Sequence, residues 1–435
     1  MTTRDPYRIV LEFSRAQRAG QPHAFEFTPQ PYLLRTPGGG FESAEFPWTA
    51  ELLADLGAAR LPGQTPEAIH RLGDTLRTFL AGAGWGHHEQ AIVRAAREGA
   101  KIHITVRSAA AELYALPWEF VALKSTGQLI GGVPGLLVRY EWPEAASFPD
   151  RVAAAARRGR VLFAWSAAGG AVPAEQHLAA LKAALDPSAF DPSRDVIAHA
   201  TWGKIDQALD DAARHGPPVD ALHLLCHGAP IGSGYGLAFD DEAQPGSAVV
   251  VDAGRVQQLL APHAGMVRLV VLSACDSGNA GDPGNHLGSV AQMIHRAGLQ
   301  AVVASRFPLS TSGSTRFTEA FYGALARDRA SLERAFLAAR DALLRDPGQL
   351  DWASVQLYSR DADGDATFPL HLSSETSTPA PSPPPTSAPP QPDLSTRRRR
   401  LTVLAAAALA TLGVTALVLV LAADQGPPVV TPPAS

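Results

Sequence analysis

The chain has 435 residues, 46% of them hydrophobic and 18% charged, so it can bury a large core, and a disordered protein is excluded. The formal net charge of −5 and the lack of a broad basic face argue against nucleic acid as a partner. Only two cysteines are present, Cys226 and Cys275, which are too few for a disulfide framework and typical of a reducing compartment.

The N-terminal third predicts an α+β subdomain over residues 1–145. Its first residues lack the charged-then-apolar pattern of a secretory signal, so we expect the body of the protein to stay in the cytoplasm. An amphipathic stretch, Ala68–Leu80, predicts a helix, and Lys101–Val106 and Gly135–Tyr140 read as strands.

Residues 146–372 alternate short apolar runs with amphipathic segments, which predicts an α/β fold. We expect buried strands at Val161–Trp165, Val196–Ala200, Ala221–Cys226, Val267–Ala274 and Ala301–Ser305. We expect helices at Ala174–Leu185, Ile205–His215, Gly288–Ala297 and Thr318–Arg327. Helices that cover both faces of a mostly parallel sheet give a three-layer α/β/α sandwich.

The C-terminal segment predicts a linker and a membrane anchor. Residues 373–396 are rich in Ser, Thr and Pro, which favours an extended, disordered tether. The uncharged run Leu401–Ala423 is long enough at helical rise to cross roughly 30 Å of hydrocarbon. Four arginines, Arg397–Arg400, should keep the preceding flank cytoplasmic, so that 397–423 forms a single-pass anchor into the lipid bilayer and 424–435 a short tail outside.

Two predicted strands end in residues able to carry chemistry. His227 closes the third strand and Cys275 the fourth, both at carboxyl ends, where loops of open α/β sheets form binding crevices. If these strands are neighbours, the imidazole can act as general base for the thiol, an arrangement suited to acyl transfer. Backbone N–H groups of Gly228 and Cys275 would then form an oxyanion hole.

Several segments together resemble the CHAT family of caspase-like cysteine peptidases. They are the Pro-Trp-Glu segment within Leu116–Phe120, Cys-His-Gly at Cys226–Gly228, Leu-Ser-Ala-Cys-Asp-Ser-Gly around Cys275, and later runs such as Phe-Tyr-Gly-Ala-Leu and Ala-Ala-Arg-Asp-Ala-Leu. The resemblance covers about the first 370 residues. It implies a caspase-like fold, His227 as base, Cys275 as nucleophile, hydrolysis of peptide bonds in a protein substrate, and roles in regulated proteolysis or bacterial defence.

One alternative from another class stays open: a non-catalytic caspase-like scaffold that binds partners at the membrane. The preference at the cleavage site also stays open, since Asp276 favours a basic residue before the scissile bond and Arg306 an acidic one.

We expect no cofactor and no metal site from the motifs considered. His223 and His227 would lie roughly 13 Å apart on an extended strand, too far to share an ion, so we expect His223 to be a packed sheet residue. The aspartates at 361, 363 and 365 lack the glycine and glutamate of a calcium loop. We interpret Asp240–Glu242 as solvated residues of a hairpin turn.

Overall fold

The computed structural model describes residues 6–16, 28–59, 66–143, 159–232, 234–244, 246–274, 289–327, 330–346 and 350–360. The predicted linker, the predicted anchor Leu401–Ala423 and Cys275 lie outside these residues. Among the helices that are described, none is both long and apolar enough to cross a membrane.

The N-terminal part contains five strands and three helices of the described chain. They are β1 (Tyr7–Arg15), β2 (Gln30–Arg35), β3 (Phe41–Phe46), α1 (Ala50–Ala58), α2 (Pro66–Ala81), α3 (Trp85–Arg97), β4 (Ile102–Ser108) and β5 (Leu136–Glu141). Short 3-10 turns between β4 and β5 are η1 (Ala111–Tyr114), η2 (Trp118–Phe120) and η3 (Ile130–Gly132). The helix predicted at Ala68–Leu80 and the strands predicted near β4 and β5 are therefore present.

The second part follows the expected alternation of strands and helices. Its elements are β6 (Arg160–Trp165), α4 (Ala174–Ala184), α5 (Pro192–Asp195), β7 (Val196–Ile197), α6 (Trp202–His215), β8 (Val219–Leu225), β9 (His227–Ile231), β10 (Gly234–Asp240), β11 (Ala248–Asp252), α7 (Ala253–Leu260), η5 (Ala261–His263), β12 (Leu269–Ser273), α8 (Val290–Arg296), β13 (Ala301–Ser305), α9 (Thr311–Tyr322), the π-helical turn η6 (Gly323–Arg327), α10 (Leu332–Leu343), α11 (Asp351–Ser354) and β14 (Val355–Ser359).

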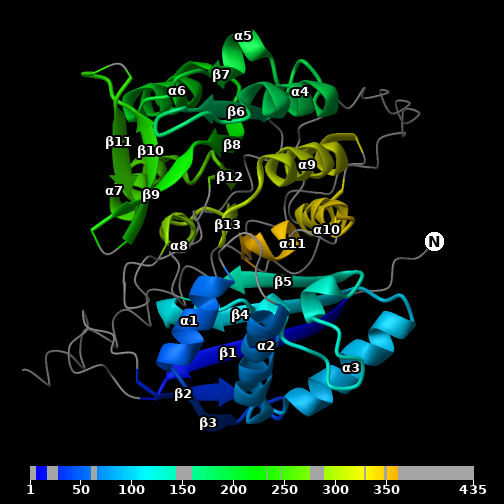
Figure 1. Cartoon of the computed structure of the whole chain (residues 1–435). Coiled ribbons are helices and arrows are strands. Elements are labelled where there is room, and N and C mark those ends of the chain that lie inside the picture. Colours follow the sequence, from blue (N-terminus) through cyan, green and yellow to red (C-terminus); the bar gives the residue numbers. More distant parts are fainter. Residues whose placement is uncertain are drawn as a thin grey trace, which may run out of the picture. The chain divides into compact units, whose positions relative to one another are not determined.

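Eleven strands form one sheet in the order β3-β2-β1-β4-β5-β14-β13-β12-β8-β6-β7 (Figure 1). Antiparallel neighbours are β1–β2, β2–β3 and β13–β14, and the other neighbours are parallel. The expected α/β architecture with a mostly parallel sheet is confirmed. One sheet includes strands from both predicted domains, because β5 of the N-terminal part pairs with β14 of the second part at Tyr140 and Tyr358.

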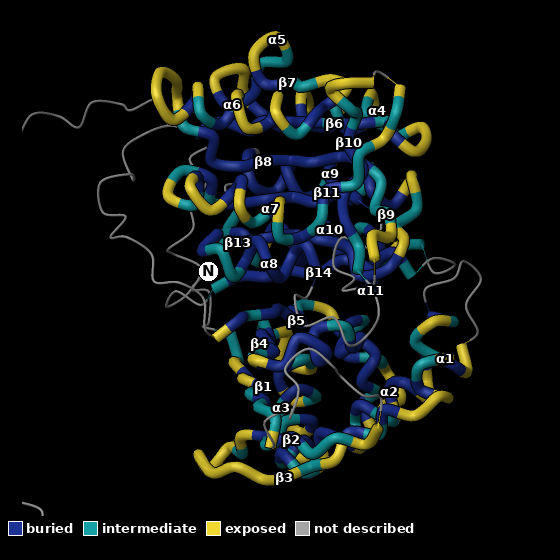
Figure 2. The backbone as a smooth tube through the Cα atoms, turned by 90° about the vertical axis from the view of Figure 1, so that its left-hand side faces the viewer, coloured by how far each residue is buried: buried dark blue, intermediate teal, exposed yellow. Residues whose placement is uncertain are grey.

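The central strands are buried on both faces, which explains their continuous apolar sequence (Figure 2). Helices α4, α9 and α10 cover one face of the second part, and α6, α7 and α8 the other (Figure 1). Side-chain caps begin several of these helices: Thr201 accepts from the N–H of Lys204 at the start of α6, and Ser289 with Gln292 forms a capping box on α8.

Two predicted elements differ from the structure. The strand expected at Val196–Ala200 shortens to two residues, because His199 takes a positive φ of 49° that an extended strand does not allow. The helix expected at Thr318–Arg327 begins earlier, at Thr311, where Ser310 caps the N–H of Gly313, and it ends in the π-helical turn. A separate three-stranded sheet, β11-β10-β9, was not expected as a sheet.

Candidate active site

The parallel pairing of β8 with β12 brings two strand ends to the same edge of the sheet. Leu225 and Ser273 are paired in register, and the N–H of Cys226 donates to the carbonyl of Ser273 over 3.4 Å. His227 lies two residues beyond Leu225, and β12 ends at Ser273, two residues before Cys275. The structure thus confirms that the strands preceding His227 and Cys275 are neighbours.

The imidazole of His227 lies under the turn that leaves β6. Its Nε2 atom is buried and makes no hydrogen bond to the described residues. A Cβ atom built on Gly170 would lie 3.2 Å from this Nε2, and one built on Gly169 would lie 3.9 Å from ring carbon Cδ2. The turn passes this close because both residues are glycines, so it covers one edge of the ring without filling the space beside Nε2.

A hydrogen-bonded chain fixes this turn to the hairpin β10–β11. Ser166 donates its N–H to the carbonyl of Leu225 over 2.9 Å and its hydroxyl to the Asp240 carboxylate over 2.6 Å. The same hydroxyl accepts the N–H of Ala168 over 3.1 Å. Asp240 therefore determines where the turn over His227 lies.

The interpretation of Asp240–Glu242 as merely solvated residues is wrong for two of the three. Asp240 holds Ser166, and the Glu242 carboxylate accepts the Thr201 hydroxyl at 2.6 Å and the Gly203 N–H at 2.9 Å. A carboxylate at the N-terminus of α6 is favourable because the N–H groups of the first turn have no partner within the helix. The hairpin itself, which carries these residues, is as expected.

The chain that leads to Cys275 is held from the neighbouring strand. Ser305, the last residue of β13, is 2% exposed and donates its hydroxyl to the carbonyl of Ala274 over 2.6 Å. Ala274 is itself buried. This bond holds the carbonyl of Ala274, the last described residue before Cys275, against the end of β13.

Arg306 does not line a specificity pocket, contrary to one of the two alternatives left open by the sequence. It is 3% exposed, and its guanidinium pairs with the Glu119 carboxylate at 2.8 Å. It also contacts the hydroxyl of Tyr140, which donates to Glu119 over 2.9 Å. Burial lowers the pKa of Arg306, but the charge and hydrogen bond of Glu119 together with Tyr140 and Tyr358 outweigh it, so the pKa lies above its ordinary value and the cation is retained. Asp276 lies outside the described residues.

His223 is a packed sheet residue, as expected, but it belongs to a buried polar cluster. Its Nε2 lies 3.3 Å from Nδ1 of His177 and 3.0 Å from the hydroxyl of Ser273, and its Nδ1 lies 3.1 Å from the hydroxyl of Tyr322. The side chain of His177 also lies 3.1 Å from the hydroxyl of Thr318. Burial lowers the pKa of His177 to about 4, and burial followed by the neighbouring His177 lowers that of His223 well below its ordinary value.

This buried pair predicts a loss of stability in mild acid. The folded protein keeps both rings neutral, whereas the unfolded chain takes up protons below about pH 6.5. For His177, stability is therefore fully present above that pH and falls as the pH drops toward about 4. We expect His177 alone to account for about 2 kcal/mol of the loss in unfolding free energy between pH 7 and pH 5.

Urea unfolding at the two pH values checks this expectation. In His177→Gln the drop between pH 7 and pH 5 should shrink by about 2 kcal/mol, and the exposed His70→Gln serves as the matched control. An unchanged drop in His177→Gln would mean that this ring is already charged in the folded protein.

Substitution of Gly170 should displace the imidazole of His227. The φ of Gly170 is +148°, and a methyl group there would meet Nε2 at 3.2 Å. Gly39→Ala is the control, since Gly39 has a φ of +86° and open space around it. We expect both alanine variants to lose roughly 1–2 kcal/mol of stability through backbone strain. Only Gly170→Ala should shift the imidazole NMR signals of His227, and an unshifted signal would show that the turn does not position the ring.

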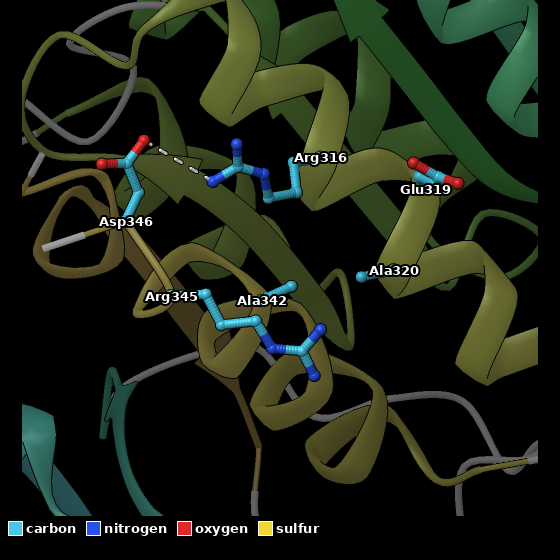
Figure 3. A pocket seen from close by; sticks show the side chains of 6 residues that line it. All are labelled: Arg316, Glu319, Ala320, Ala342, Arg345 and Asp346. Carbon is cyan, nitrogen blue, oxygen red and sulfur yellow. Dashed lines mark ion pairs between the residues drawn. The ribbon is translucent and has the colours of Figure 1, made fainter.

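None of the three pockets described next is lined by His227. One of about 560 Å³ lies between α9 and α10, where side chains of both signs face each other and Arg316 pairs with Asp346 at 3.8 Å (Figure 3). A second of about 920 Å³ lies along α3 beside Lys124. Near the candidate site, a pocket of about 610 Å³ is bounded by His199, Lys204 and Asp240.

The fold is that of an α/β protein with a mostly parallel sheet, and its candidate site lies at the carboxyl ends of two neighbouring parallel strands. The CHAT domain family model matches residues 88–360, and the chain belongs to this family. No match is found among curated proteins.

The similarity of this chain to solved structures is weak. The Arg-specific cysteine proteinase gingipain R is 11% identical with a TM-score of 0.39, over 69% of this chain and 68% of that chain. The pro- and mature-domain complex of Porphyromonas gingivalis RgpB is 12% identical with a TM-score of 0.37, over 71% and 70%. Separase of Saccharomyces cerevisiae is 11% identical with a TM-score of 0.36, and the match spans 60% of this chain but 16% of separase.

Sequence reasoning missed the supports of the candidate site. The Gly169–Gly170 pair directly after a predicted strand is the one local signal that could have indicated a close backbone approach. The bonds from Ser166 to Asp240 and from Arg306 to Glu119 span 74 and 187 residues, so no local pattern reveals them.

Proposed function

We propose that the chain is a cysteine endopeptidase of caspase-like type, with His227 as general base and Cys275 as nucleophile. The observation that carries the proposal is the register of β8 and β12. Leu225 faces Ser273, and both proposed reactive residues follow two positions later on neighbouring parallel strands. The Nε2 of His227 has no partner among the described residues, so no hydrogen bond within them occupies the nitrogen that the proposal assigns to the base.

The reaction proceeds through an acyl-enzyme. His227 takes the proton of the Cys275 thiol, and the sulfur attacks the carbonyl carbon of the peptide bond. The C–N bond then breaks, and the imidazolium gives its proton to the leaving amine. A water molecule that His227 deprotonates attacks the thioester, the C–S bond breaks, and the acid product leaves.

Backbone N–H groups of Gly228 and Cys275 form the oxyanion hole in this proposal. Gly228 follows the base directly and is half-buried in β9, opposite Leu237. Donors of this kind stabilise the negative charge that develops on the substrate carbonyl oxygen.

We also propose that Leu401–Ala423 anchors the peptidase in a lipid bilayer with its catalytic part in the cytoplasm. The supports are the length and apolar composition of this run and the arginines at 397–400 before it. Such an anchor restricts the enzyme to protein substrates near the membrane, in regulated proteolysis or bacterial defence signalling. If a chain that ends at Ser373 restores full function in cells, the membrane role is abandoned.

Selective alkylation of the full chain tests the proposed dyad, because the molecule carries an internal control. Cys275 activated by His227 should react with iodoacetamide at pH 6, where an ordinary thiol with a pKa of about 8.5 is almost unreactive. Cys226 is 3% exposed and should react only after unfolding. In His227→Ala, Cys275 should lose its reactivity at pH 6.

Two results would contradict the proposal. One is a reactivity of Cys275 that rises only near pH 8.5 in the wild type. The other is identical profiles for the wild type and His227→Ala. Either result favours the alternative of a non-catalytic scaffold.

A further inference from the structure

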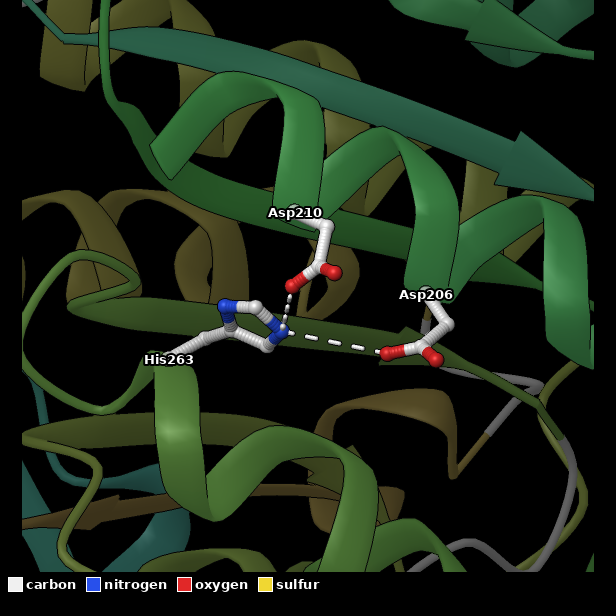
Figure 4. A group of neighbouring side chains, drawn as sticks. All are labelled: Asp206, Asp210 and His263. Atoms are coloured by element: carbon white, nitrogen blue, oxygen red, sulfur yellow. Dashed lines mark ion pairs between the residues drawn. The ribbon is translucent and has the colours of Figure 1, made fainter. Parts of the chain in front are cut away.

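Three side chains on the helical face opposite α9 and α10 converge on one point, away from His227. Asp206 and Asp210 lie one turn apart on α6, and His263 ends the 3-10 turn η5 after α7. The Nε2 of His263 lies 3.9 Å from an oxygen of Asp206 and 3.8 Å from one of Asp210, and the three groups point toward each other (Figure 4). One ligand atom from each residue lies within 4.8 Å of the other two.

The imidazole of His263 is the buried member of this cluster. Its side chain is 6% exposed, whereas those of Asp206 and Asp210 are 58% and 42% exposed. Separations of 3.8 and 3.9 Å are too long for hydrogen bonds. The Nε2 atom of this buried ring therefore faces two carboxylates that it does not reach by a hydrogen bond.

The geometry points to a binding site for a divalent transition-metal cation, best filled by Zn²⁺, with Asp206, Asp210 and His263 as its protein ligands. Ligands about 2.0–2.2 Å from a tetrahedral Zn²⁺ lie roughly 3.3–3.6 Å from one another. The two imidazole–carboxylate distances exceed this by a few tenths of an ångström, and the carboxylates are exposed enough to move toward the ion. One imidazole and two carboxylates leave the fourth position to water.

The second oxygen of Asp210 is held in a way that suits this role. Arg214, one turn further along α6, donates to it over 2.5 Å, while the first oxygen faces His263. A hydrogen bond of this kind orients a carboxylate ligand and prevents it from turning away. Without a cation, the like charges of Asp206 and Asp210 at i and i+4 would weaken the helix.

The ligand set discriminates among cations. Mg²⁺ and Ca²⁺ prefer oxygen ligands in larger number, and two monodentate carboxylates with one imidazole fit neither. An imidazole with carboxylates is a set that Zn²⁺ accepts.

A cation at this site would link α6 to the segment between η5 and β12. The carbonyl of His263 accepts the N–H groups of Met266 and Val267, each over 2.8 Å. Val267 is completely buried, and the N–H of Arg268 donates to the carbonyl of Asp220 in the neighbouring strand β8. The site therefore lies at the opposite end of β12 from Cys275 and takes no part in the proposed chemistry.

Equilibrium dialysis of the full chain against Zn²⁺ tests the inference. Every protein carries Cys275→Ala, so that this thiolate does not contribute a competing site. We expect one Zn²⁺ per chain, an affinity at least about 10-fold lower in Asp206→Asn and in His263→Gln, and no change in Asp211→Asn. Asp211 is exposed on the same helix and loses the same charge, which makes it the matched control.

A second readout does not depend on stoichiometry. Zn²⁺ should raise the unfolding temperature of the control and not that of Asp206→Asn, whose exposed position allows it to fold, and Mg²⁺ should have no such effect. Equal zinc affinity in all variants, or no binding by the parent protein, would overturn the inference.

Discussion

Glu119→Gln is expected to lower the free energy of unfolding by about 3–5 kcal/mol, because it leaves a buried guanidinium without its counter-charge. Glu119 is 3% exposed, and its carboxylate accepts from both Arg306 and the hydroxyl of Tyr140. Arg306 directly follows β13, whereas Glu119 and Tyr140 belong to the N-terminal part of the chain. The pair thus joins two regions of the sheet that are far apart in sequence.

A double-mutant cycle separates the lost charge from lost packing. Glu119→Leu should destabilise the protein as strongly as Glu119→Gln, whereas Glu119→Leu combined with Arg306→Met should recover much of the loss, because neither charge is then left buried. Glu67→Gln, in the exposed first turn of α2, is the control and should change stability by less than about 0.5 kcal/mol. Additive effects of the two substitutions in urea unfolding would show that the residues are not coupled.

His227→Ala is expected to lower peptidase kcat by about 10⁴-fold or more, and Cys275→Ala to abolish acyl-enzyme formation. The two residues act as one unit, so the double variant should be no less active than either single variant. Residual cleavage by His227→Ala should rise with pH toward about 8.5, because the unassisted thiol of Cys275 reacts only as the thiolate.

The matched control uses the other cysteine. Cys226→Ala changes a residue adjacent to His227 but removes no proposed reactive group, and it should keep most of the activity. Stability measured by urea unfolding must accompany each variant. A fully active Cys275→Ala with unchanged stability would exclude thiol catalysis at this position.

Much of the fold could be predicted because the central strands are buried on both faces. The run Ala301–Ser305 matches β13 at both ends, since apolar residues fill the strand and a buried arginine follows it. Strand β1 was missed. Its residues alternate between buried and more exposed positions. The strand is held in the sheet by pairing with β4, which lies some 90 residues later, so the local sequence does not reveal this partner.

The candidate site shows the same limit. The strands that precede His227 and Cys275 could be predicted because their apolar runs end in residues with a local signature, and the structure places these strands side by side. The supports of the site could not, because Asp240 reaches Ser166 only after the hairpin β10–β11 folds back over β6. No local sequence pattern indicates a role for His263 either, since Asp206 and Asp210 lie on α6, more than 50 residues earlier.

The comparison of new protein N-termini in cells that carry the native chain or Cys275→Ala tests the central claim most directly. We expect N-termini that appear only with the native chain, that disappear in His227→Ala as well, and that persist in Cys226→Ala. The residue before each new N-terminus would also decide the preference at the cleavage site. Identical sets of N-termini in the native and Cys275→Ala cells, under conditions that induce the pathway, would contradict the account and favour a scaffold.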